Sequence, residues 1–165
     1  MPVVLLRVDD RYIHGQITAK WMQRVNGQAI WVVSDALGKN PVLKSLQESL
    51  APPGSKVKIS SVNEALKECK SVDKGNERVV LLVASPEDAL TVMKNGIGVD
   101  HVNVGQMGFK HGKKQVSKTV SVDANDVKAF KEIIKMGVRL EYQQLPDFPQ
   151  KPVDFEATLK EMKLI

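Results

Sequence analysis

The residues best suited to chemistry lie in one ten-residue stretch, residues 7–16, which reads Arg-Val-Asp-Asp-Arg-Tyr-Ile-His-Gly-Gln. Arg7 and Arg11 supply fixed positive charge and forked donors that suit a phosphoryl group. Within their reach, His14 is the residue suited to act as a nucleophile or to transfer a proton. The nearby guanidinium groups disfavour its imidazolium form. An aspartate of the same stretch can orient the ring and stabilise the charge that develops during reaction. This combination favours phosphoryl transfer.

The placement of this stretch strengthens that interpretation. A buried strand over residues 2–8 precedes it, and three apolar residues at four-residue spacing predict a helix after it: Ile17, Trp21 and Val25. The helix is expected to begin near His14 or Gly15 and to close at Gly27. The stretch then lies at the carboxyl end of a strand and at a helix start, where ligands and anions bind.

A second interpretation of the same residues stays open. Asp9 and Arg11 can form a solvated ion pair while His14 caps the helix without any chemistry. The two arginines, the following glycine and the junction between strand and helix argue against that interpretation.

Alternating strand and helix patterns predict an α/β fold over a single domain, residues 1–165. Continuous apolar strands indicate helices on both faces, so we expect an open three-layer α/β/α architecture with a mainly parallel, twisted sheet of about six to seven strands. Helix starts are indicated by capping residues at Ser61–Glu64, Ser85–Pro86 and Asp123–Asp126, and a short helix is expected over 155–162. Helix ends are expected at Gly96 and Gly137. The predicted strands are residues 2–8, 29–34, 57–60, 79–84, 101–104, 119–122 and 138–142.

Composition excludes several other classes of protein. The chain has 165 residues, of which 42% are hydrophobic and 26% charged, close to globular averages. Its longest apolar run, residues 79–84, is far shorter than the roughly 20 residues of a membrane-spanning helix. Arg7 interrupts any secretory signal, so we expect a cytoplasmic protein. The net charge of +5 permits an acidic partner without demanding nucleic acid.

Residues 7–16 resemble the signature segment of the IIB subunits of the mannose, fructose and sorbose class of the bacterial sugar phosphotransferase system, usually written A-R-I-D-D-R-L-I-H-G-Q. The resemblance extends over essentially the whole chain, through Trp21 in the first helix, Asn103-Val104-Gly105 after a later strand, and Leu145-Pro146 near the end.

Two departures from the family pattern leave partner and sugar specificity open. Tyr12 stands where leucine is commoner, and Ser34-Asp35 stands where many members have Asn-Asp.

The resemblance implies a phosphohistidine relay and an open, mostly parallel sheet. A phosphoryl group would pass from a IIA histidine to His14, and then to a sugar hydroxyl carried by the membrane subunits IIC and IID. This makes the chain a protein-phosphohistidine–sugar phosphotransferase that associates peripherally with a membrane transporter. The site residues that follow are His14, Arg11 and Asp10 as catalytic residues and Arg7, Gly15 and Gln16 as phosphoryl-binding residues. No cofactor or metal is expected, since positioning and positive charge can supply the catalysis.

Several properties are not fixed by the resemblance. The length favours an isolated IIB subunit over a IIA–IIB fusion, while a homo-oligomer stays open. The sugar also stays open among mannose, fructose, sorbose and amino sugars. The alternative function is a non-catalytic anion-binding or regulatory α/β module that uses the same loop.

Other signals are weaker. Cys69 is the residue type that carries the phosphoryl group in other IIB classes, but it shares a helical stripe with apolar residues, which favours a buried structural thiol. The scattered histidines lack zinc-site spacing, and His101 is expected to be structural. Residues 105–108 (Gly-Gln-Met-Gly) fit a phosphate-wrapping loop or a plain turn.

The basic cluster Lys110–Lys118, which includes His111, fits an acidic IIA surface, but a solvated loop is the favoured interpretation. No nucleic-acid-binding motif accompanies the cluster, and only 5% of the residues are aromatic, so no nucleic-acid partner is expected.

Overall fold

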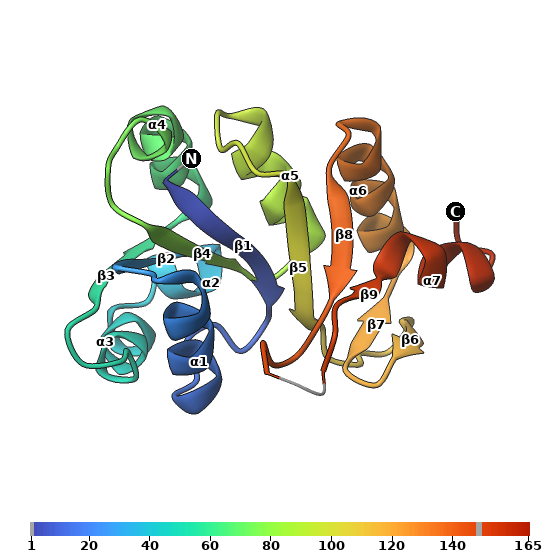
Figure 1. Cartoon of the computed structure of the whole chain (residues 1–165), viewed down its shortest axis with the longest axis horizontal. Coiled ribbons are helices and arrows are strands. Elements are labelled where there is room, and N and C mark those ends of the chain that lie inside the picture. Colours follow the sequence, from blue (N-terminus) through green and yellow to red (C-terminus); the bar gives the residue numbers. More distant parts are fainter. Residues whose placement is uncertain (1, 148–149) are drawn as a thin grey trace.

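A seven-stranded sheet with β1 (Val3–Asp9) at its centre organises the chain (Figure 1). The computed structural model describes residues 2–147 and 150–165. The strand order is β3-β2-β4-β1-β5-β8-β9; each neighbouring pair is parallel except β8 and β9, which are antiparallel. The other strands are β2 (Ala29–Val33), β3 (Lys56–Ser60), β4 (Val79–Val83), β5 (His101–Gln106), β8 (Arg139–Tyr142) and β9 (Val153–Asp154).

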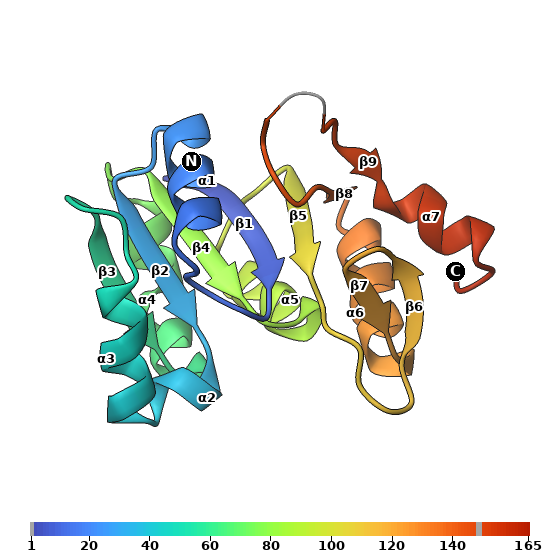
Figure 2. The same cartoon turned by 90° about the horizontal axis from the view of Figure 1, so that it is seen from below.

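Helices cover both faces of the sheet, as predicted. One face carries α1 and α3, and the other carries α4, α5 and α6, while α7 flanks β8 and β9 (Figures 1 and 2). No helix of residues 2–147 and 150–165 is long and apolar enough to cross a membrane. The helices are α1 (Gln16–Val25), α2 (Asp35–Gly38), α3 (Pro41–Ser49), α4 (Val62–Asp73), α5 (Pro86–Lys94), α6 (Ala124–Lys135) and α7 (Phe155–Glu161).

Two apolar clusters form the core, one on each face of the sheet. The larger cluster joins the sheet to α4, α5, α6 and α7, and in it Phe130 packs edge-to-face on Phe155 with ring centroids 5.2 Å apart. The smaller cluster joins the sheet to α1 and contains Ile13 and Trp21. Because Ile13 is fully buried, the loop that precedes α1 is packed into the core rather than left in solvent.

The predicted helix starts are confirmed by their caps. Ser61 with Glu64 and Asp123 with Asp126 form reciprocal capping boxes, and the Ser85 hydroxyl accepts from the first turn of α5. Both glycines expected at helix ends have a positive φ, 121° for Gly96 and 79° for Gly137. Local capping chemistry therefore determines these ends.

The end of α1 differs from its prediction. The left-handed residue is Asn26, with φ 52°, and not Gly27. The N–H of Gly27 donates to the Met22 carbonyl at 2.8 Å, and a Cβ at position 27 would lie 2.7 Å from the Met22 sulfur. Position 27 therefore does not need glycine for its φ angle, and a Cβ there would require the flexible end of the Met22 side chain to shift.

Four elements were not predicted: α2, α3, β6 (Lys114–Ser117) and β9. The predicted strand 119–122 does form β7 (Val120–Val122), but β7 pairs with β6 in a separate antiparallel hairpin instead of joining the main sheet. These elements lack the buried apolar pattern of the central strands, and α3 contains no buried residue. Their positions depend on neighbouring elements more than on their own sequence.

Candidate active site

The loop between β1 and α1 lies at the carboxyl edge of the sheet, where the chain direction divides. The chain leaves β1 toward β2 and leaves β5 toward β8, so the carboxyl ends of β1 and β5 border a topological switch point. Ligands of open α/β sheets bind at such points. Residues 7–16 therefore lie at the carboxyl end of a strand, as expected, and the strand order places that end at a switch point.

The carboxylate of Asp9, the last residue of β1, is the centre of the site. Its Oδ2 accepts from His14 Nε2 at 3.0 Å, Arg11 Nη2 at 3.0 Å and Arg7 Nη2 at 3.1 Å. Its Oδ1 accepts from the backbone N–H of Arg11 at 3.0 Å and from Arg11 Nε at 3.1 Å. Burial raises the pKa of Asp9, but hydrogen bonds from His14 and Arg11 and the charge of Arg7 outweigh it and hold the pKa below its usual range. Asp9 is therefore a fixed negative charge.

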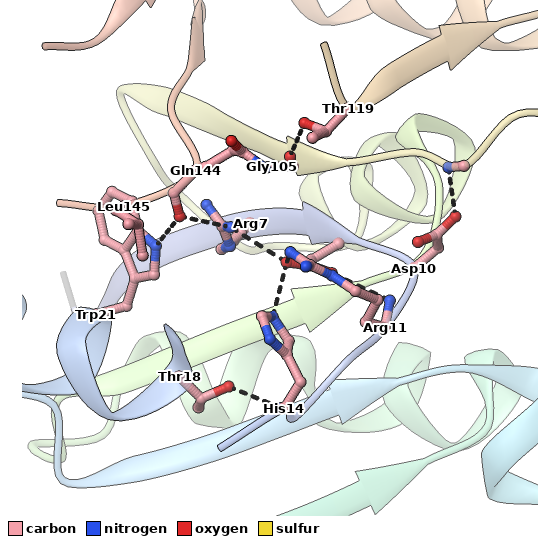
Figure 3. A network of polar contacts seen from close by, with 12 residues as sticks. Arg7, Asp10, Arg11, His14, Thr18, Trp21, Gly105, Thr119, Gln144 and Leu145 are labelled. Atoms are coloured by element: carbon pink, nitrogen blue, oxygen red, sulfur yellow. Dashed lines mark hydrogen bonds and ion pairs between the residues drawn. The ribbon is translucent and has the colours of Figure 1, made fainter. Parts of the chain in front are cut away.

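His14 is held from two directions. Its ring bonds to Asp9 through Nε2, and its backbone N–H donates to Thr18 Oγ1 at 3.1 Å (Figure 3). An ionised carboxylate only accepts, so in the neutral ring Nε2 carries the proton and the lone pair is on Nδ1. The side chain of His14 is 18% exposed. The arrangement leaves Nδ1 as the nucleophilic atom, on a ring whose orientation is fixed.

Arg11 lies beside His14 and is partly exposed, with 34% of its side chain accessible. Its Nε and Nη2 form a two-point contact with both oxygens of Asp9. This contact uses one edge of the planar guanidinium group, so the Nη1 edge points away from the carboxylate. Arg11 can therefore keep its contact with Asp9 and still donate to an anion.

Arg7 is in a different position from the one expected. Only 2% of it is exposed, and its Nη1 and Nη2 are engaged by Asp9, by the side chain of Asn103, and by the carbonyls of Gln143 and Gln144 at 2.8 and 3.1 Å. Burial lowers the pKa of Arg7 to about 10, against the opposing effect of Asp9, and leaves it protonated at neutral pH. A buried guanidinium group with these partners cannot contact a phosphoryl group directly. We therefore assign Arg7 a positioning role.

Arg7 contacts Trp21 and the segment 103–105, and it bonds to the residue just before Leu145. Its guanidinium carbon lies 5.0 Å from the Trp21 ring centroid, and the Trp21 Nε1 donates to the Gln144 carbonyl at 3.1 Å, next to Leu145 (Figure 3). Gly105 makes room for Arg7, since a Cβ there would lie 2.1 Å from Nη2. The sequence indicated these segments separately, and the structure shows that they share one buried cation.

Asp10 also differs from its expected role. Its Oδ2 accepts the N–H of Gly108 at 2.7 Å, whereas the carboxylate that touches His14 belongs to Asp9. Strand periodicity carried a signal for this: Arg7 and Asp9 are two residues apart on one strand and so share a face, from which Asp10 is excluded. Asp10 therefore ties the loop after β5 to the reactive loop. The segment 105–108 packs against Arg7 at Gly105 and binds Asp10 at Gly108.

The backbone between Asp9 and α1 is tightly folded. Tyr12 has φ 61° and donates its N–H to the Asp9 carbonyl at 3.0 Å, and Gly15, the residue before α1, has φ 64°. The Tyr12 hydroxyl lies 2.9 Å from Ser34 Oγ, so the two departures from the family pattern contact each other. Gln16 is exposed at the first position of α1.

The remaining candidates lie outside this cluster. Cys69 is fully buried, and burial raises the pKa of its thiol, which agrees with a structural residue. His101 is the first residue of β5, at the end of that strand that is far from the site, and its Nδ1 lies 2.6 Å from Asp100 Oδ1. His111 is exposed in the loop after β5.

The fold and site define a class of open α/β proteins in which a histidine follows the central strand and is oriented by a buried carboxylate. Residues 3–164 match the family model described as the PTS system sorbose subfamily IIB component. The chain is 39% identical over 153 residues to the sorbose-specific EIIB component of Lacticaseibacillus casei, covering 93% of each protein. It is 37% identical to the mannose-specific EIIAB component of Escherichia coli K12, covering 91% of this chain and 46% of that protein.

A solved structure agrees with these matches. The crystal structure of the IIBSor domain of the sorbose permease from Klebsiella pneumoniae superposes with a TM-score of 0.90, at 35% identity and with 98% of both chains covered. The chain belongs to the sorbose-type IIB family of the bacterial sugar phosphotransferase system. This result confirms the predicted family and the α/β fold class.

The close packing of Arg7 on Gly105 generates a prediction about stability. Gly105→Ala places a Cβ 2.1 Å from Nη2 and 2.2 Å from Cζ of Arg7. Overpacking of this kind should reduce the free energy of unfolding by about 1–3 kcal/mol, measured by urea denaturation. Gly75→Ala is the control, because its nearest new contact is a carbonyl oxygen at 3.3 Å. Equal losses in the two variants would contradict the role assigned to Gly105.

The buried charge of Asp9 generates a second prediction. Asp9→Asn leaves Arg7 without its charged partner, so the free energy of unfolding at pH 7 should fall by about 3–5 kcal/mol. Since folding lowers the pKa of Asp9, the ionised carboxylate stabilises the fold above about pH 4, and this contribution disappears as the pH falls through the folded-state pKa.

The difference in the free energy of unfolding between wild type and Asp9→Asn should therefore shrink as the pH is lowered. Urea denaturation at several pH values measures it. Asp147→Asn removes a surface partner of Lys20 and should change stability by less than about 1 kcal/mol. A difference for Asp9→Asn that is independent of pH would show that the carboxylate charge is not what stabilises the site.

Proposed function

We propose that this IIB component accepts a phosphoryl group on His14 from a phosphorylated IIA protein and passes it to a sugar held by the membrane subunits IIC and IID. It would do so in the cytoplasm, at the membrane surface. IIB components of the phosphotransferase system are phosphotransferases, and family membership supports the coarser part of this function. The observation that carries the finer part is the contact of His14 Nε2 with buried Asp9, which leaves Nδ1 free to react.

The proposed transfer follows from the charges of the site. Nδ1 of His14 attacks phosphorus as the bond from phosphorus to the donor imidazole breaks, and the electron pair of that bond returns to the donor nitrogen. The ring of His14, which keeps its Nε2 proton, gains positive charge, and Asp9 stabilises this charge. Arg11 and the N–H groups at the start of α1 face the negative charge of the phosphoryl oxygens.

The onward step reverses this bond change. The bond between phosphorus and Nδ1 breaks and its electron pair returns to the ring, while the sugar oxygen takes the phosphoryl group and its hydroxyl proton passes to solvent. Since His14 must release the group that it accepts, strong binding of the intermediate would slow the relay. The partial exposure of His14 and Arg11 fits a site that two protein partners reach in turn.

The second candidate is a non-catalytic anion-binding module, and covalent labelling separates the two functions. The intact protein is incubated with a phosphorylated donor cascade and examined by mass spectrometry. We expect one acid-labile phosphoryl group in wild type and none in His14→Ala, with the fold unchanged by circular dichroism. His101→Ala and His111→Ala should both still be labelled. Full labelling of His14→Ala would refute the proposed acceptor.

Arg11 provides a quantitative test of the mechanism. An arginine that donates two charged hydrogen bonds to the phosphoryl group contributes about 2–3 kcal/mol, so Arg11→Ala should slow transfer by roughly 30- to 150-fold. Arg11→Lys keeps the charge and loses the planar guanidinium group, so its rate should fall between those of wild type and Arg11→Ala. The measurement is the single-turnover rate at saturating phosphorylated IIA.

Arg11 also contacts Asp9, so thermal unfolding of each variant is measured in parallel. A rate for folded Arg11→Ala equal to that of wild type would show that Arg11 takes no part in the transfer.

A further inference from the structure

An exposed aromatic residue and an exposed basic cluster lie beside the reactive loop. Phe109 is 71% exposed, and it follows Gly108, whose N–H is bound by Asp10. Asp10 itself is four residues before His14. We call this region the Phe109 surface; its members, all exposed, are Phe109, Lys110, His111, Lys114 and Lys118.

The Phe109 surface stands on a turn that is fixed at both ends. At one end Gly108 donates to Asp10 at 2.7 Å. At the other end Lys113, whose side chain is only 17% exposed, donates to Asp126 Oδ2 at 2.8 Å, at the start of α6. Within the turn the N–H of Lys113 donates to the Lys110 carbonyl at 3.0 Å, and Gly112 takes the left-handed conformation with φ 86°. A fixed turn presents its side chains to a partner with little loss of entropy on binding.

The charge of this surface has one sign. Residues 105–119 contain four lysines and one histidine but no Asp or Glu. Lys113 is neutralised at the start of α6, whereas among the ion pairs of residues 2–147 and 150–165 none involves Lys110, Lys114 or Lys118. An exposed aromatic residue in a segment of lysines without ion-pair partners suits an interface with an acidic partner.

We propose that the Phe109 surface docks the phosphorylated IIA donor, through an acidic surface of the donor with an apolar recess for Phe109. This proposal rests on the proposed function. The charges favour the donor, because the transferred group adds negative charge to the partner before the reaction and to this chain after it. The basic surface therefore attracts the loaded donor and loses part of that attraction once His14 carries the phosphoryl group.

The same geometry gives Asp10 a role as a positioning residue. Its carboxylate does not contact His14, but it holds Gly108 and so places Phe109 relative to the reactive loop. Loss of this contact should move the docking surface without changing the reactive groups. Asp10→Ala removes this acceptor and should accordingly weaken docking, while Asp9 and His14 keep their contact.

The first experiment measures the single-turnover rate of transfer to His14 against the concentration of phosphorylated IIA. Phe109→Ala should raise the half-saturating concentration by about 10-fold or more and leave the limiting rate unchanged. Asp10→Ala should shift the same parameter in the same direction. Replacement of Lys110 and Lys114 by alanine should weaken docking and reduce its dependence on salt.

Matched controls come from other surfaces of the chain. Met136→Ala removes an exposed apolar side chain at the end of α6, and Lys131→Ala removes an exposed charge from that helix; both should behave as wild type. Val42→Ala tests whether the donor binds to α3 instead, where Val42 is an apolar residue that is 76% exposed. An unchanged half-saturating concentration in folded Phe109→Ala, or a shift produced by Val42→Ala alone, would overturn the proposal.

A second experiment separates this proposal from the proposed function. The ¹⁵N-labelled chain is titrated with unphosphorylated IIA, and amide shifts are expected in residues 108–114 but not in α7. If residues 108–114 shift but the chain accepts no phosphoryl group, the proposed function is refuted and the docking surface is retained. Normal labelling by IIA, with a Phe109→Ala defect confined to sugar phosphorylation in vesicles containing IIC and IID, would assign the surface to the membrane subunits and overturn the proposal.

Discussion

The ion pair between Arg7 and Asp9 is the interaction on which the site depends. Both side chains are buried on the central strand, with 2% and 0% of their surface exposed. A buried charge without a partner is strongly destabilising, so neither residue is tolerated without the other. The hydrogen bonds that complete the pair come from β5, from the segment after β8 and from the reactive loop. The site can therefore form only when these segments are all in place, which links the geometry of His14 to the complete fold.

This arrangement gives different roles to three charged residues of one short segment. Arg7 is buried and holds neighbouring segments together. Asp9 fixes the ring of His14, and Arg11 binds Asp9 while remaining partly exposed. A fixed carboxylate and a fixed cation beside the histidine would need little reorganisation during the proposed phosphoryl transfer. The turn that carries Phe109 is joined to the reactive loop by the bond from the Gly108 N–H to Asp10.

Local patterns predicted most of the fold because its central elements have strong local signals. The buried strands β2 and β4 are apolar throughout, and the capping boxes at Ser61 and Asp123 begin their helices as predicted. The elements that were missed have weak signals of their own. Helix α3 buries no side chain, and its link to the reactive loop is one bond, from the Ile13 N–H to Gln47 Oε1 at 2.8 Å. Such a contact between distant residues has no periodicity to reveal it.

By itself the sequence determined the fold class, the family and the loop that carries His14, because strand and helix periodicity, helix caps and a ten-residue motif are local properties. Strand periodicity carried a signal for which aspartate shares a face with Arg7, whereas tertiary structure alone decided the roles of the two arginines. Those roles come from contacts over long separations: Arg7 bonds to Asn103 across 96 residues and to the Gln143 carbonyl across 136. The requirement for glycine at position 105 has the same origin, since it exists only once Arg7 packs against β5.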